Sequence, residues 1–137
     1  MFNYIDSYLH GNKIGVLVIF SCTDEFSFNT KQFKDLSKNI GMHIAASRPK
    51  SIDYESLDPI FINKELSYTR NSIEDLSPDE RLRAMDKAIK NIKRDYCLLD
   101  QPFIINPETT VLEEILRVSA ELGVTIEITD YKRLEAS

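Results

Sequence analysis

Ile14-Gly15-Val16-Leu17-Val18-Ile19-Phe20 is the most apolar run in the sequence, and the other elements are best understood around it. Apolar side chains occupy both alternating faces of this run, which predicts a central strand covered on both sides. The run continues into the connector Ser21–Thr30, which holds two acids and two phenylalanines. Because loops fixed between rigid elements often carry function, this connector is the first candidate for a functional site.

The residues before the apolar run predict its partner strand. Residues 2 to 10 alternate with a period of two and are rich in side chains that favour strands. His10-Gly11-Asn12-Lys13 then supplies a turn, since Gly and Asn tolerate positive φ. We therefore expect a β-hairpin over residues 2–21.

The residues after the connector predict a helix over about 31–46. Thr30 is a suitable N-cap, and the apolar positions that follow fall on one helical stripe: Phe33, Leu36, Ile40 and Ile44. Gly41 weakens a helix, so we expect close packing at that point. Pro49 ends the helix, because proline restricts the residue before it.

The second half of the sequence contains two further motifs that are typical of helix N-termini. Ser77-Pro78-Asp79-Glu80 begins a helix that should run to about Tyr96, and Thr110–Glu113 forms a second capping box. The second of these helices should end at Gly123 and bury five apolar side chains: Leu112, Ile115, Leu116, Val118 and Leu122. A shorter helix is expected over 60–69, and residues 72–77 are expected to form a loop.

Residues 124–134 alternate apolar and polar side chains and predict a last, half-exposed strand. The economical arrangement is α+β: an antiparallel sheet of about three strands with helices packed on it. We expect a single domain over residues 1–137, with a variable helical insertion around 59–96.

Composition narrows the functional classes. The net charge of −5 argues against a general grip on nucleic-acid phosphates, and no glycine-rich phosphate motif is present. Two distant cysteines and two histidines predict neither a disulfide framework nor a metal site, and no cofactor is expected. No apolar run approaches the length of a membrane span, and no signal peptide is visible, which predicts a cytoplasmic protein.

The predicted helix that ends near Tyr96 carries the basic residues Lys87, Lys90, Lys93 and Arg94. They are best interpreted as a solvated face, with contact to an acidic partner or to RNA as alternatives.

Four ordered segments resemble the bacterial elongation factor Ts family. They are Gly11–Val18, Cys22–Ser27 (against the family's C-E-T-D-F-V), Phe33–Ala46 (against F-x-x-L-A-K-D-x-A-M-H-I-A-A) and Leu98–Phe103 (against L-L-E-Q-P-F). The closing strand through Tyr131–Glu135 is also similar. Each segment alone is unspecific, but four in the right order identify the family.

The resemblance implies a guanine-nucleotide exchange factor for the GTPase elongation factor Tu, with no covalent chemistry of its own. The family's T-D-F-V tip aligns with Asp24, Glu25, Phe26 and Ser27. Phe26 would be the wedge near the GTPase Mg²⁺, and Glu25 stands where the family has aspartate. The residues alone favour a different interpretation, in which Phe26 is a packed loop aromatic and the two acids are solvated turn residues or helix N-terminal charges.

Departures from the family pattern keep a second hypothesis open. The family usually begins with a small three-helix module, whereas this sequence starts at the predicted core strand, and Thr129-Asp130 replaces an arginine pair. The alternative is a module that binds elongation factor Tu, or itself as a homodimer, without efficient exchange. An enzyme is not expected, because no nucleophile–base pair or metal-ligand cluster is visible.

Overall fold

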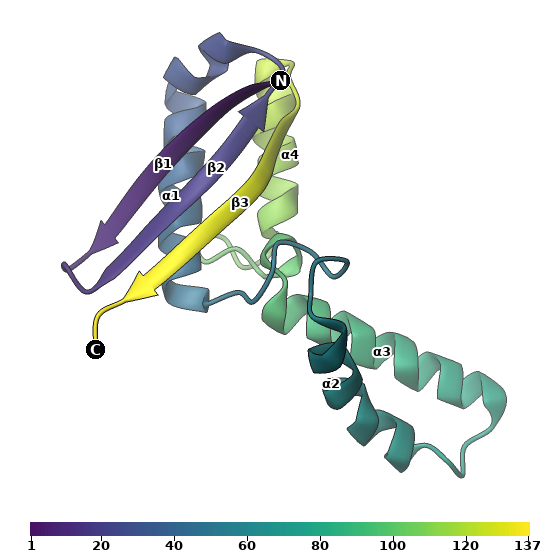
Figure 1. Ribbon diagram of the computed structural model, residues 1–137. Coiled ribbons are helices and arrows are strands. Elements are labelled where there is room, and N and C mark those ends of the chain that lie inside the picture. Colours follow the sequence, from purple (N-terminus) through teal and green to yellow (C-terminus); the bar gives the residue numbers. More distant parts are fainter. The chain divides into compact units, whose positions relative to one another are not determined.

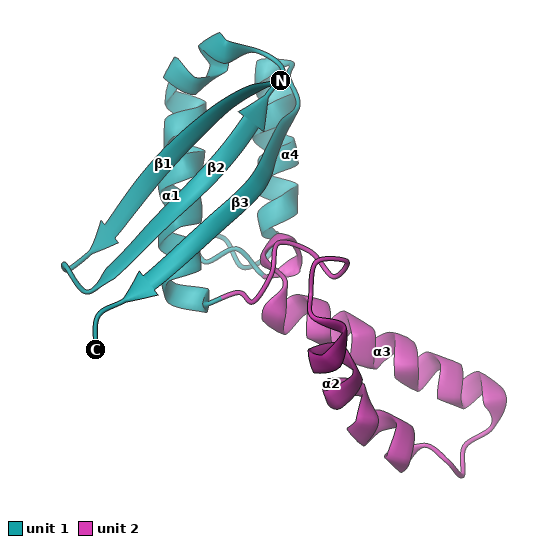
Figure 2. Cartoon of the chain, viewed as in Figure 1, with its two compact units in different colours: residues 1–48, 102–137 teal, residues 49–101 magenta.

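The computed structural model describes residues 1–137 and divides them into two compact units (Figure 2). One unit comprises residues 1–48 and 102–137, and the other comprises residues 49–101. The second unit is wider than the helical insertion expected around 59–96. None of the helices combines the length and apolar character needed to cross a membrane.

The first unit is built on a three-stranded antiparallel sheet with the order β1-β2-β3 (Figure 1). The strands are β1 (Phe2–His10), β2 (Ile14–Cys22) and β3 (Ile126–Glu135). The turn between β1 and β2 has positive φ at both central residues, 56° at Gly11 and 58° at Asn12, as a tight hairpin requires. The predicted hairpin, the central position of β2 and the α+β class are confirmed.

The sheet is covered on one face only. Val16, Val18 and Phe20 are buried beneath α1 (Lys31–Ser47) and α4 (Val111–Leu122), which both lie behind the sheet in Figure 1. Leu17, on the opposite face of β2, is 47% exposed. The expectation that β2 is covered on both faces is therefore wrong. Apolar residues on both faces of a strand do not show which face packs against other elements.

Helix α1 begins and packs as its sequence predicts. The Thr30 hydroxyl accepts a hydrogen bond from the backbone N–H of Phe33 at 3.2 Å, and this satisfies one of the unpaired donors of the first turn. A Cβ added to Gly41 would lie 2.7 Å from Cβ of Tyr8. The expected close approach at this glycine is thus a contact between α1 and β1.

Helix α4 confirms both predicted ends but only part of the predicted buried face. Thr110 and Glu113 form a complete capping box, and Gly123 ends the helix at φ 68°. Leu112 and Leu116 are exposed, contrary to prediction. Ile115 and Val118 are buried as predicted, and the third buried apolar residue of the stripe is Val111, which was not predicted.

The alternation of strand β3 changes phase halfway along the strand. A register shift opposite Ile19 and Phe20 lets Ile126 and Ile128 face the helices before it, and Tyr131 and Arg133 after it. The Arg133 guanidinium donates to the carbonyl of Ala45 at 2.9 Å and ties the strand to the end of α1.

The second unit is a helical hairpin of α2 (Pro59–Ser72) and α3 (Pro78–Tyr96), followed by the short 3₁₀ helix η2 (Leu98–Asp100). Helix α2 is longer than the predicted 60–69, because Asp58 caps it and Pro59 occupies its first turn. The two ends of the unit pair with each other: the Leu98 N–H donates to the Ser51 carbonyl at 2.8 Å. Its core consists of Leu57, Leu66, Ile92 and Cys97.

Candidate partner-binding tip

The connector between β2 and α1 is a short, tightly tethered 3₁₀ helix, η1 (Glu25–Asn29). Its start is pinned to the residue before β3, since the Thr23 N–H donates to the Thr125 carbonyl at 3.2 Å. The Thr125 N–H donates back to the Thr23 hydroxyl at 3.1 Å. The connector is thus held at one end by backbone and side-chain hydrogen bonds.

The acidic residues of the connector have different roles. The Asp24 carboxylate accepts from the N–H of Phe26 at 3.1 Å, and the Asp24 carbonyl accepts from the N–H of Ser27 at 3.2 Å. Asp24 therefore caps η1 and shapes the turn. Glu25 is exposed and has no ion-pair partner. Of the two acids, Glu25 is the one free to meet another molecule.

The two phenylalanines of the connector lie on opposite sides. Phe28 is buried and stacks on Tyr4, with ring centroids 5.0 Å apart, and meets Phe33 edge-on at 5.1 Å. Phe26 is 77% exposed. An exposed aromatic side chain on an anchored turn can serve as an anchor in a protein interface.

The structure brings three of the four predicted tip residues to the surface together. Asp24, Glu25 and Phe26 are exposed, whereas Ser27 is buried. The Ser27 carbonyl accepts from the Thr30 hydroxyl at 2.7 Å, which joins η1 to the cap of α1. Ser27 can support the tip, but its side chain is not presented to a partner.

A second candidate surface is the uncovered face of the sheet. Five apolar side chains from all three strands lie on it: Ile5, Leu9, Leu17, Ile19 and Leu134. Leu9 and Leu134 are more than 70% exposed. In the sequence, Ile5 and Leu9 indicate this surface, because they fall on the same face of the strand predicted over residues 2–10. We refer to these five residues as the open sheet face.

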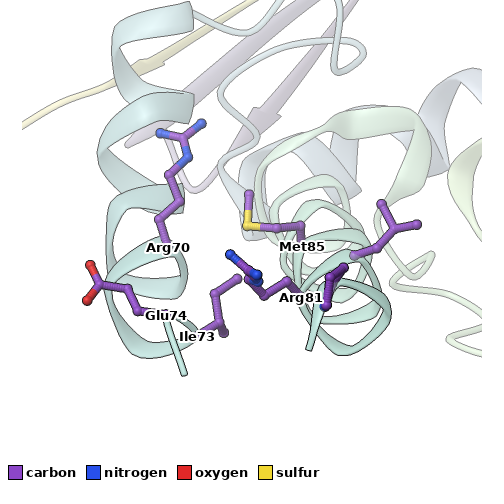
Figure 3. A pocket seen from close by; sticks show the side chains of 7 residues that line it. Arg70, Ile73, Glu74, Arg81 and Met85 are labelled. Carbon is purple, nitrogen blue, oxygen red and sulfur yellow. The ribbon is translucent and has the colours of Figure 1, made fainter. Parts of the chain in front are cut away.

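The helical hairpin carries an open groove of about 600 Å³ between the end of α2 and the start of α3. In Figure 3, Met85 and Arg81 lie between the two helices, while Glu74 points outward. No group of histidine, cysteine or acidic side chains in the protein is arranged to hold a metal. The lining of the groove combines apolar side chains with three charged ones, Arg70, Glu74 and Arg81.

The buried cysteines and His43 are structural. Cys22 and Cys97 are both fully buried. Burial raises the pKa of the Cys97 thiol, which a hydrogen bond from Ser51 partly opposes, so the thiol stays neutral and unreactive in the folded state. The His43 ring accepts from the N–H of Ile104 at 3.2 Å and stacks on Phe103. These groups are part of the packed interior of the fold.

Comparison with known proteins agrees with the four resembling segments. The sequence model of the family described as elongation factor TS matches residues 2–137. The chain belongs to the elongation factor Ts family. The elongation factor Ts proteins of Alkaliphilus metalliredigens and Heliobacterium modesticaldum are 33% and 34% identical to it. That of Lawsonia intracellularis is 35% identical. Each match covers 96% of this chain.

The relatives of this elongation factor Ts chain are longer than the chain itself. It spans 62% of the Alkaliphilus metalliredigens and Heliobacterium modesticaldum proteins and 46% of the Lawsonia intracellularis protein. Membership of the family therefore places the chain among translation elongation factors.

Proposed function

We propose that this chain binds elongation factor Tu and promotes release of its bound GDP, using the tip formed by Asp24, Glu25 and Phe26. The observation that carries the proposal is the exposed Phe26 ring on a turn that is anchored at both ends. The resemblance of residues 22–27 to the family tip supports the same assignment.

The residues of the connector have different roles in the proposed mechanism. Phe26 enters a pocket of the GTPase as a rigid wedge, which requires a turn that does not yield. Phe28 provides that rigidity, since it is locked in the aromatic cluster with Tyr4 and Phe33. Asp24 keeps the turn in shape, and its carboxylate is already engaged.

Glu25 supplies the charge of the proposed mechanism. Its carboxylate approaches the Mg²⁺ that the GTPase holds beside GDP, and Mg²⁺ tolerates little departure from octahedral geometry. Binding of the tip and binding of GDP then oppose each other. Because such coupling is reciprocal, GDP must weaken binding of this chain by the same factor.

The test is GDP release from elongation factor Tu preloaded with fluorescent GDP. Micromolar protein should accelerate release, and Phe26→Ala should abolish most of the acceleration. Tyr68→Ala removes an equally exposed aromatic from α2 and should leave the rate unchanged. The exchange mechanism is wrong if folded wild-type protein does not accelerate release.

The open sheet face favours a second candidate: a module that associates with another copy of itself and binds elongation factor Tu without efficient exchange. Four of its five apolar side chains are 47% to 79% exposed, and a contiguous exposed apolar surface marks an interaction site. Tight binding of the GTPase without GDP release would support this candidate. Sedimentation of wild-type protein and of Leu17→Glu/Leu134→Glu would detect the homodimer, which the double variant should dissociate.

A further inference from the structure

The solvent face of α3 carries an evenly spaced row of cations. Arg83, Lys87, Lys90 and Arg94 follow at steps of four, three and four residues, and all four are exposed. This spacing keeps them on one helical stripe about 16 Å long. The opposite side of α3 packs into the hairpin core through Met85, Ile89 and Ile92. We refer to the four cations as the α3 basic row.

The cations of the row are largely unneutralised. Arg83, Lys87 and Lys90 form no ion pair, although Asp79 and Asp86 lie three or four residues away, and Arg94 pairs only with its neighbour Asp95. Arg117 on α4 shows the contrast, since it is held by Glu114 at 3.0 Å and by Glu121 at 2.6 Å. The α3 basic row thus keeps its charge available for another molecule.

The chemistry around the row selects the kind of partner. The residues that flank it on the same side are the acids Glu80 and Asp86 and the amide Asn91, and none of them is the large apolar anchor that protein interfaces usually bury. It also lacks the aromatic side chains on which unpaired bases stack. What remains is a line of positive charge, which complements the phosphates along a double helix.

We propose that the α3 basic row binds the phosphate backbone of a nucleic-acid duplex, of which folded RNA is the form that a translation factor meets. The net charge of −5 predicts weak binding by the chain as a whole. The α3 basic row is a locally positive surface on this negatively charged chain. Its contacts with phosphates would not distinguish one base sequence from another. This inference uses residues outside the tip and does not depend on nucleotide exchange.

The test is fluorescence anisotropy of a labelled RNA hairpin titrated with the full chain. At about 50 mM KCl we expect a dissociation constant of roughly 10⁻⁴ M or tighter, because backbone binding is typically in the range of 10⁻⁶ to 10⁻⁴ M even at physiological salt. The logarithm of affinity should fall with the logarithm of salt concentration with a slope near −3.6 if all four cations contact phosphates. A DNA hairpin of the same sequence should bind with a similar slope.

Variants locate the contact. Lys87→Glu/Lys90→Glu should weaken binding at least about tenfold and reduce the steepness of the slope by about two. Lys34→Glu/Lys38→Glu makes the same charge change on exposed positions of α1 and should bind nearly as well as wild type. Lys87→Gln/Lys90→Gln, with circular dichroism of each variant, separates charge loss from misfolding.

Three results would overturn the proposal. The first is no binding of the RNA hairpin by folded wild-type protein at about 50 mM KCl. The second is equal weakening in the α1 control, which would assign binding to overall charge. The third is tighter binding of a labelled polyglutamate peptide than of either duplex, which would make an acidic protein the partner of the row.

Discussion

The two units of the chain differ in how much apolar surface each encloses. In the unit of residues 1–48 and 102–137, the sheet and two helices surround fully buried side chains such as Phe20, Phe33 and Ile40. In the unit of residues 49–101, six apolar residues are buried, and several others are only partly covered. Because local stability follows the density of buried contacts, we expect the second unit to open more readily.

Each unit contains one fully buried cysteine, which makes the comparison measurable. Cys22 lies in the core of the first unit and Cys97 in that of the second. A buried thiol reacts only when its surroundings open, so its labelling rate reports the stability of its own unit. The difference also has a functional meaning, because the tip extends from the more densely packed unit.

The largest effect is expected from Phe33→Ala. This ring is fully buried and meets Phe20, Phe28 and Tyr4. Its loss should cost about 3–5 kcal/mol and accelerate labelling of Cys22 roughly 100-fold or more. Cys97 should respond much less. Equal acceleration of both thiols, measured by mass spectrometry, would mean that the two units unfold as one.

Ile92→Ala is the mirror experiment in the second unit. Ile92 is buried in the small hairpin core, so its truncation should cost about 2–4 kcal/mol. Labelling of Cys97 should then accelerate at least about tenfold while that of Cys22 stays at its wild-type rate. An accelerated Cys22 would show that the hairpin supports the sheet unit.

In the wild-type protein, we expect a smaller difference between the labelling rates of the two cysteines. Cys97 should react at least about tenfold faster than Cys22, because the unit around it buries fewer apolar groups. Labelling of both thiols in denaturant provides the reference for their intrinsic reactivity. Slower reaction of Cys97 than of Cys22 would reverse the proposed order of stability.

The smallest effect is expected from the exposed aromatics, one in each unit. Phe26→Ala and Tyr68→Ala should each change the free energy of unfolding by less than about 0.5 kcal/mol, since neither ring is packed. Thermal unfolding measures both. A loss above about 1 kcal/mol for Phe26→Ala would show that the ring supports the fold instead of standing ready for a partner.

Local chemistry explains which parts of the fold were predictable. The hairpin turn at Gly11-Asn12 and the caps at Thr30, Thr110 and Gly123 depend on residues close in sequence, and all are found as expected. Their signals are hydrogen bonds and backbone angles that neighbouring residues set by themselves.

Burial depends on distant partners and was predicted less well. Leu17 and Leu116 are as apolar as their buried neighbours, and only the folded chain shows that nothing covers them. The same holds for the site. Phe26 and Phe28 are two residues apart and equivalent by type, and the 3₁₀ turn capped by Asp24 decides which of them packs against Tyr4.

The paired ends of residues 49–101 have a consequence for how this sequence can change. Because Ser51 and Cys97 lie side by side in a parallel bridge, the chain leaves the hairpin next to where it begins. A segment with adjoining ends can be lengthened, shortened or replaced without rerouting the residues on either side. This hairpin can therefore change in length or be replaced during evolution without a change in the tip or the sheet.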